Sequence, residues 1–127
     1  MVENKIEQYL IDLKYSYSEV KPNLWLLDDK EHDLEGIAVM YAEPLVIIRV
    51  QVMNAPEKDR LEFYAKLLEL NACDMIHGAY GLEGDKVVLI DTLEYETLDY
   101  EEFRAVLDAI SLVITQHYPI LSVYREK

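Results

Sequence analysis

A chain of 127 residues with 51% apolar and 29% charged side chains has the length and composition of one globular domain, residues 1–127. Its 25 acidic side chains outnumber 12 basic ones, and the formal net charge of −13 argues against binding to nucleic acid or to an anionic membrane surface. Cys73 is the only cysteine, which excludes an intrachain disulfide and is typical of a reducing compartment.

The N-terminal segment predicts an amphipathic helix, with Asn4 as its cap. Its apolar residues follow i, i+3, i+4, i+7 spacing, at Ile6, Tyr9, Leu10 and Leu13. The first five residues are polar and show no secretory signal, and the longest apolar runs are shorter than a membrane span. We therefore expect a cytoplasmic protein.

Apolar runs in the next part of the chain predict strands. Residues 15–20 and 24–27 are either two strands or one interrupted strand, and residues 36–42 form the next. The clearest strand covers residues 45–53, because its apolar residues alternate. One of its faces is apolar throughout, whereas the other begins apolar and ends polar, so we expect only one end of that second face to be covered.

A second helix is predicted from Asn54, as its cap, to about Asn71, with Pro56 in the first turn. Its apolar residues form two stripes. We expect the first stripe to face the sheet: Leu61, Tyr64, Ala65 and Leu68. The second stripe lies on a different arc and needs a cover: Phe63, Leu67 and Leu70. We predict that a second copy of the chain covers it in a homodimer, with another part of the same chain as the alternative.

Residues 77–82 and 86–94 predict a hairpin whose turn lies at Gly84, because glycine adopts the positive φ that a tight turn needs. The last helix begins at the cap Asp99, with Glu102 three residues later in a capping box, and we expect Pro119 to end it. Its apolar stripe extends to His117, and Ser111 is expected on the opposite, solvent-facing side.

The order of these elements predicts an α+β fold with a largely antiparallel sheet and helices packed against it. No internal repeat or linker interrupts the chain.

The sequence contains no catalytic constellation that we can identify. Cys73 follows the end of a helix, where the dipole does not favour a thiolate, so a small packed side chain is the expected role. His32, His77 and His117 lie in separate elements without metal-ligand spacing, and no glycine-rich phosphate loop is present. We therefore predict no catalytic residue, no metal and no cofactor.

The negative charge is concentrated, since nine acidic residues lie between Glu83 and Asp108 against Lys86 and Arg104. Solubility alone accounts for such a surface, and attraction of a basic protein partner is the alternative. Among ten tyrosines, Tyr95 and Tyr100 are candidate contact anchors, because aromatic side chains with a polar tip are enriched at interfaces.

Several segments together resemble the YbjN-like proteins and the broader type III secretion chaperone-like superfamily, which includes the CesT-type chaperones. They are Leu67-Leu68-Glu69-Leu70-Asn71, His77-Gly78-Ala79-Tyr80-Gly81-Leu82, Lys86-Val87-Val88-Leu89, Leu98-Asp99 and His117-Tyr118-Pro119. The resemblance covers about residues 57–120. It implies an α-β-β-β-α-β-β-α fold and a homodimer. Chaperones of this superfamily bind an extended segment of an effector, and YbjN-like proteins are described as regulators of sensory transduction.

We therefore predict a non-enzymatic homodimer that binds a protein client, in a chaperone-like or regulatory role. The alternatives are a signalling regulator that binds a small ligand or another signalling protein and, third, a small enzyme with an unrecognised pocket. An enclosed pocket would favour the ligand-binding regulator, and a pocket with convergent titratable groups would favour the enzyme.

Overall fold

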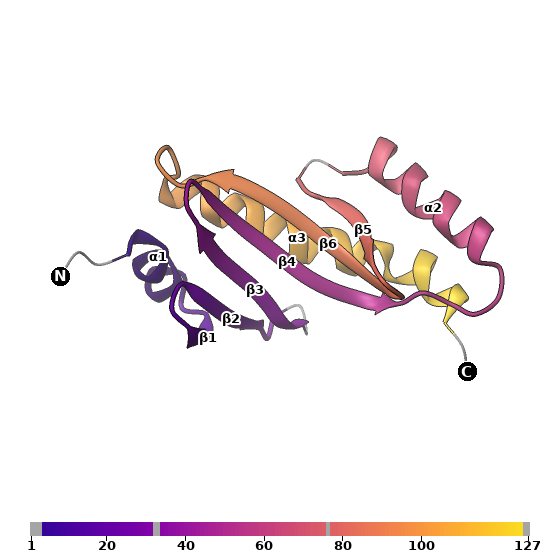
Figure 1. Ribbon diagram of the computed structural model, residues 1–127, viewed down its shortest axis with the longest axis horizontal. Helices are drawn as coiled ribbons and strands as arrows, with labels where there is room; N and C mark the ends of the chain where they lie inside the picture. Colours follow the sequence, from indigo (N-terminus) through magenta and orange to yellow (C-terminus); the bar gives the residue numbers. More distant parts are fainter. Residues whose placement is uncertain (1–3, 32–33, 76, 126–127) are drawn as a thin grey trace.

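The computed structural model describes residues 4–31, 34–75 and 77–125, and within them six strands form one antiparallel sheet (Figure 1). The strand order is β1-β2-β3-β4-β6-β5, so β1 and β5 form the two edges. The strands are β1 Ser16–Lys21, β2 Leu24–Asp29, β3 Leu34–Ala42, β4 Leu45–Asn54, β5 Ala79–Glu83 and β6 Lys86–Glu94. Residues 15–27, which the sequence left open, thus contain two strands.

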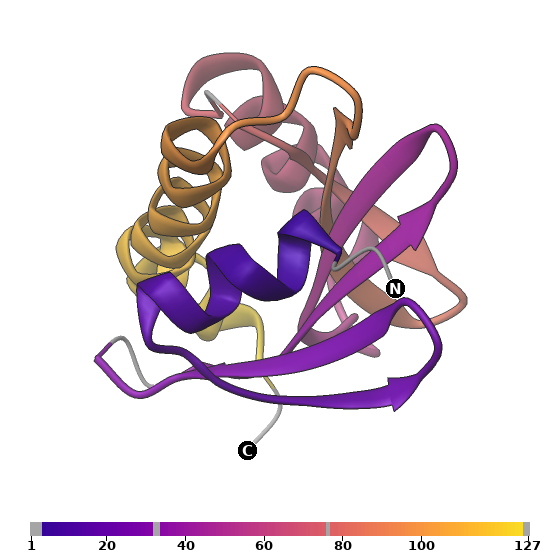
Figure 2. The same ribbon diagram turned by 90° about the vertical axis from the view of Figure 1, so that its left-hand side faces the viewer.

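Three α-helices accompany the sheet in this described part: α1 Lys5–Leu13, α2 Arg60–Cys73 and α3 Tyr100–Leu121, followed by the 3-10 turn η1 Ser122–Tyr124. The sheet curves around α1 and α3, and α2 lies beyond its β5 edge (Figure 2). The predicted α+β fold, with helices packed against an antiparallel sheet, is confirmed. Four strands precede α2, one more than the resemblance implied.

The hydrophobic core lies between the curved sheet and the helices. Alternation along β4 produces it as predicted, because Val46, Ile48 and Val50 are buried while the residues between them are partly exposed. From α1, Ile6 and Leu10 join this core, and Asn4 caps that helix by accepting the Ile6 N–H through its side-chain oxygen. The predicted first helix is confirmed.

The start of α2 differs from the prediction. Strand β4 continues to Asn54, which pairs with Lys86, and the Ala55 N–H donates to the Asp85 carbonyl at 2.7 Å. Proline disfavours helical backbone in the residue before it, so Pro56 holds Ala55 outside a helix. The helix begins four residues later, at Arg60.

The last helix begins as predicted, and its cap supports a first prediction. The Asp99 carboxylate accepts the Glu102 backbone N–H at 2.8 Å. Replacing Asp99 by Ala removes this acceptor from the first turn, and we expect a loss of about 1 kcal/mol in the free energy of unfolding. Urea denaturation checks it, with Glu101→Ala in the same turn as the control. A variant as stable as wild type would contradict a stabilising cap.

Two predictions about α3 were wrong. Pro119 does not end the helix, which continues to Leu121 because Leu121 is buried in the core and the Ser122 N–H still reaches the Tyr118 carbonyl. Ser111 does not face solvent: it is fully buried, and its hydroxyl donates to the Asp29 carboxylate at 2.7 Å. A hydrogen bond to another element places this polar side chain inside, which periodicity cannot predict.

Length and composition would allow the segment Tyr100–Tyr124 to cross a membrane. Its apolar stripe instead packs on the sheet, with Phe103, Leu107 and Ile110 almost fully buried. A core helix has the same length and composition, so this segment is weak evidence for a membrane span.

Candidate protein-binding surfaces

The two stripes of α2 face opposite to the predicted directions, except that Tyr64 packs against the core as predicted. Phe63, Leu67 and Leu70, predicted to form the dimer interface, are buried in the core of the same chain. Leu61 and Leu68, predicted to face the sheet, are 85% and 69% exposed. The prediction that a second copy covers the first three residues was therefore wrong, because the chain's own core, including the Tyr124 ring 5.2 Å from that of Phe63, surrounds them.

The exposed side of α2 is the first candidate surface. It carries an apolar stripe at i, i+4, i+7 and i+11 spacing: Leu61, Ala65, Leu68 and Ala72. This spacing lines up one face of a helix over its whole length. The stripe alternates large and small side chains, a pattern that allows close approach of another helix.

The outer face of the sheet, opposite the core, is the second candidate surface. In the described residues no helix lies over this face (Figure 2). The pairing aligns one row across all six strands: Ser18, Leu26, Ala38, Arg49, Ile90 and Ala79. A second row runs through Leu24, Met40, Ile47 and Thr92. The centre of this face, on β2 to β4, is apolar, and Leu26 and Met40 are each 38% exposed.

One ion pair lies on this outer face. The guanidinium of Arg49, on β4, donates to both carboxylate oxygens of Glu83, on β5, across the intervening strand β6. The hydrogen bonds from Arg49 lower the pKa of Glu83 from its ordinary value. Because both side chains are partly exposed, we assign the pair little stabilising energy. It marks the polar boundary of the apolar centre.

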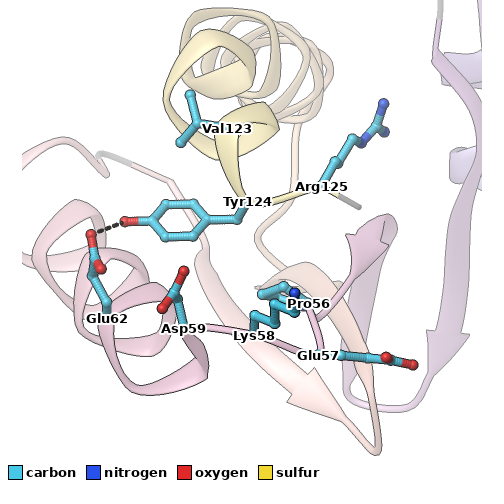
Figure 3. A pocket seen from close by; sticks show the side chains of 8 residues that line it. All are labelled: Pro56, Glu57, Lys58, Asp59, Glu62, Val123, Tyr124 and Arg125. Carbon is cyan, nitrogen blue, oxygen red and sulfur yellow. Dashed lines mark hydrogen bonds between the residues drawn. The ribbon is translucent and has the colours of Figure 1, made fainter. Parts of the chain in front are cut away.

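An open groove lies where η1 meets the segment before α2 (Figure 3). It has a volume of about 580 Å³, and an adjoining hollow shares Pro56, Tyr124 and Arg125 with it. The Tyr124 hydroxyl donates to the Glu62 carboxylate at 3.1 Å, which directs the ring across the groove, whereas Glu57 points away from it. This groove is not enclosed, so it lacks the form expected of a small-ligand pocket.

Both tyrosines predicted as contact anchors contact their own chain. Tyr95 stacks on Tyr41 with ring centroids 4.3 Å apart, and the Lys5 ammonium lies 4.5 Å above its ring. Tyr100 meets the edge of Tyr9 at 5.8 Å. These rings connect the N-terminal helix to the start of α3, and because both side chains stay partly exposed, their role as contact anchors remains a prediction.

The histidines and the cysteine occupy separate places. His117 is 2% exposed and packed as predicted, with its Nδ1 2.7 Å from the Tyr80 hydroxyl and its Nε2 3.2 Å from the Asp74 carboxylate. Cys73 is exposed, which corrects the prediction of a packed thiol, and His32 lies outside the described residues. Over residues 4–31, 34–75 and 77–125, no three His, Cys, Asp or Glu side chains are grouped to hold a metal ion.

A family model describes the whole chain. CesT_Tir_1 matches residues 1–127. The chain belongs to the CesT_Tir_1 family. The resemblance noted in the sequence is thereby confirmed. No curated protein matches the chain.

Solved structures with this fold come from two settings. YbjN of E. coli, described as a putative transcription regulator, is 21% identical with a TM-score of 0.67, covering 91% of this chain and 90% of its own. A chain of the heterodimeric ExoU–SpcU complex from the type III secretion system of Pseudomonas aeruginosa is 13% identical with a TM-score of 0.73, covering 91% and 97%. A chain of the HopA1–SchA chaperone–effector complex is 11% identical with a TM-score of 0.62, covering 87% of each chain.

Proposed function

We propose that this protein is a non-enzymatic, homodimeric protein-binding module of the cytoplasm, which holds a protein client in a chaperone-like or regulatory role. The exposed apolar centre of the outer sheet face is the observation that carries the proposal, because uncovered apolar surfaces mark interaction sites and no helix of the described residues covers this one (Figure 2). Membership of the CesT_Tir_1 family and likeness to a chain from a chaperone–effector complex support it.

The client surface is the centre of the outer face on β2 to β4. Its exposed side chains, Leu26 and Met40, are flexible or branched apolar groups that adapt to different partners. The net charge of −13 favours encounter with a basic client. An extended or helical segment with apolar anchors and flanking lysine or arginine residues fits this chemistry.

A matched pair of variants tests the client surface. Met40→Glu places a charge at the centre of the outer face, and Leu112→Glu places one on a comparably exposed leucine of α3. Affinity capture from extract of the native cell should recover a client with wild type and Leu112→Glu, and at least about tenfold less with Met40→Glu, because a charge is costly to desolvate. Equal recovery by both variants would contradict the assignment to this face.

The self-contact is proposed on the exposed stripe of α2, replacing the buried stripe predicted from sequence. Two such helices packed antiparallel about a two-fold axis place Ala65 of one copy against Leu68 of the other, so a small side chain faces a large one. The expected contact removes Leu61 and Leu68 from water, which are the most exposed leucines of the described residues.

Light scattering tests the dimer. Wild type should have the mass of two chains at micromolar concentration, and Leu68→Glu should have the mass of one chain with unchanged circular dichroism, because Leu68 makes no contribution to the core. Leu112→Glu serves as the control and should remain dimeric. A wild-type mass of one chain would end the homodimer proposal, whereas a dimeric Leu68→Glu would place the contact elsewhere.

A further inference from the structure

The two edges of the sheet differ in how their backbone groups are covered. Strand β1 forms one edge and β5 the other. An edge strand offers unpaired N–H and C=O groups to any extended chain, and proteins cover or disrupt such edges to avoid unwanted pairing. Strand β1 has exposed residues and an irregularity between Glu19 and Lys21. On strand β5, a side chain from a helix forms hydrogen bonds with the outward backbone groups of one residue.

The side chain of Asn71, in the last turn of α2, occupies the place of a neighbouring strand beside β5. Its Oδ1 accepts the Tyr80 backbone N–H at 2.8 Å, and its Nδ2 donates to the Tyr80 carbonyl at 3.2 Å. A primary amide presents an acceptor and a donor side by side, as a strand does, so one side chain satisfies both outward groups of one edge residue.

A second connection holds the same turn in place. Asp74 caps the C-terminus of α2, and His117 connects its carboxylate to the Tyr80 hydroxyl. With Nε2–H donating to Asp74, Nδ1 accepts the Tyr80 O–H, so all three groups are satisfied. Tyr80 is thus bound to α2 through its backbone and, by way of α3, through its side chain.

Another residue of β5 also directs its backbone groups away from β6, while α2 runs alongside this edge and its Arg60 guanidinium lies 3.2 Å from the Asp85 carboxylate at the hairpin turn. Backbone groups alternate in direction along a strand, so Leu82 directs its N–H and C=O outward as Tyr80 does, while Gly81 faces β6. Two β5 strands placed antiparallel about a two-fold axis at Gly81 would match Tyr80 of one copy with Leu82 of the other. The absence of a side chain at Gly81 leaves room at that axis.

We infer that Asn71 closes the β5 edge of the sheet against strand addition by another chain, and that β5 of a second copy is the strand it excludes. The hydrogen bonds between Asn71 and Tyr80 then block this edge, and the sheet can extend through β5 only after Asn71 has left Tyr80. This inference does not depend on the proposed client or on the α2 contact.

Hydrogen exchange in the wild-type protein tests the contact between Asn71 and Tyr80 without any substitution. The amides of Tyr80 and Leu82 both point outward, but only the former has a partner in Asn71. After correction for intrinsic rates, Tyr80 should exchange about tenfold more slowly than Leu82, which corresponds to the net free energy of one hydrogen bond. Equal rates at the two amides, whether both fast or both slow, would overturn the inference.

Removal of the Asn71 side-chain amide gives the second test. Asn71→Ala should associate at least about tenfold more strongly than wild type in sedimentation velocity, since it frees the outward N–H and C=O of Tyr80 for pairing. Glu69→Ala, on the same helix but away from β5, is the control and should match wild type. Adding Leu82→Pro removes an outward N–H and should abolish the extra association. A folded Asn71→Ala that sediments like Glu69→Ala would overturn the inference, and Asn71→Asp, which loses only the donor, replaces Ala if that variant does not fold.

Discussion

Replacing Phe63 by Ala should lower the free energy of unfolding by about 3–5 kcal/mol, because the change removes a fully buried aromatic ring and leaves a cavity. The centroid of the ring lies 5.2 Å from that of Tyr124 and 6.0 Å from that of Tyr64, so both tyrosine rings lose a contact when it is removed. Leu68→Ala, on the opposite side of the same helix, should change the stability of the monomer by less than about 0.5 kcal/mol, because Leu68 is exposed.

Urea denaturation at nanomolar concentration separates these two variants. Dilution is needed because a dimer contact through α2 would stabilise the wild type at higher concentrations. Leu68→Ala would then also lose that stabilisation, and the difference in free energy of unfolding between the two variants would be smaller. The assignment made from sequence, with Leu68 facing the sheet and Phe63 facing a partner, predicts the opposite order. A larger loss for Leu68→Ala at high dilution would show that α2 is turned the other way.

The sequence predicted the elements of this fold more accurately than the direction each helix faces. Alternation along β4 and the cap at Asp99 are local signals, and both were confirmed. Helix α2 has apolar residues on two arcs, so periodicity alone could not decide which arc enters the core. Packing decides it: Phe63 fits beside Tyr124, a residue about 60 positions later in the chain, and that proximity has no local signal.

The candidate surfaces were predicted in part, and the expectation that the apolar end of the second face of β4 is covered was wrong, because no helix lies over that face in the described residues (Figure 2). An outer face of β4 that is apolar at one end and polar at the other was evident from Ile47 and Arg49. Its extension through Met40 and Leu26 depends on strand register, which hydrophobic pattern does not specify across separate hairpins. The contact between Asn71 and Tyr80 could not be predicted for the same reason. It joins the end of a helix to an edge strand, and the position of that strand depends on the order of all six strands in the sheet.

Alkaline pH should destabilise this protein through Tyr15. Burial, together with the negative charges of Asp29, Asp108 and Glu31, raises the pKa of the Tyr15 phenol from 10.0 to about 12. The folded state therefore keeps the phenolic proton to a higher pH than the unfolded state. By linkage, the stabilising contribution is complete below pH 10 and is lost as the pH rises to about 12. Burial also raises the pKa of Tyr80, so this second phenol acts in the same direction.

Two substitutions isolate the contribution of Tyr15. Each pKa unit corresponds to about 1.4 kcal/mol, and after allowance for solvent screening of a partly exposed group we expect Tyr15 to contribute about 1–2 kcal/mol of the loss. Urea denaturation at intervals from pH 8 to 12 should show a steeper fall for wild type than for Tyr15→Phe, which has no phenolic proton to lose. Tyr118→Phe removes an exposed phenol and is the matched control, with the wild-type slope expected. If Tyr15→Phe lost stability as steeply as wild type, burial would not raise the pKa of Tyr15 in the folded state, and the fall would arise from other groups such as Tyr80.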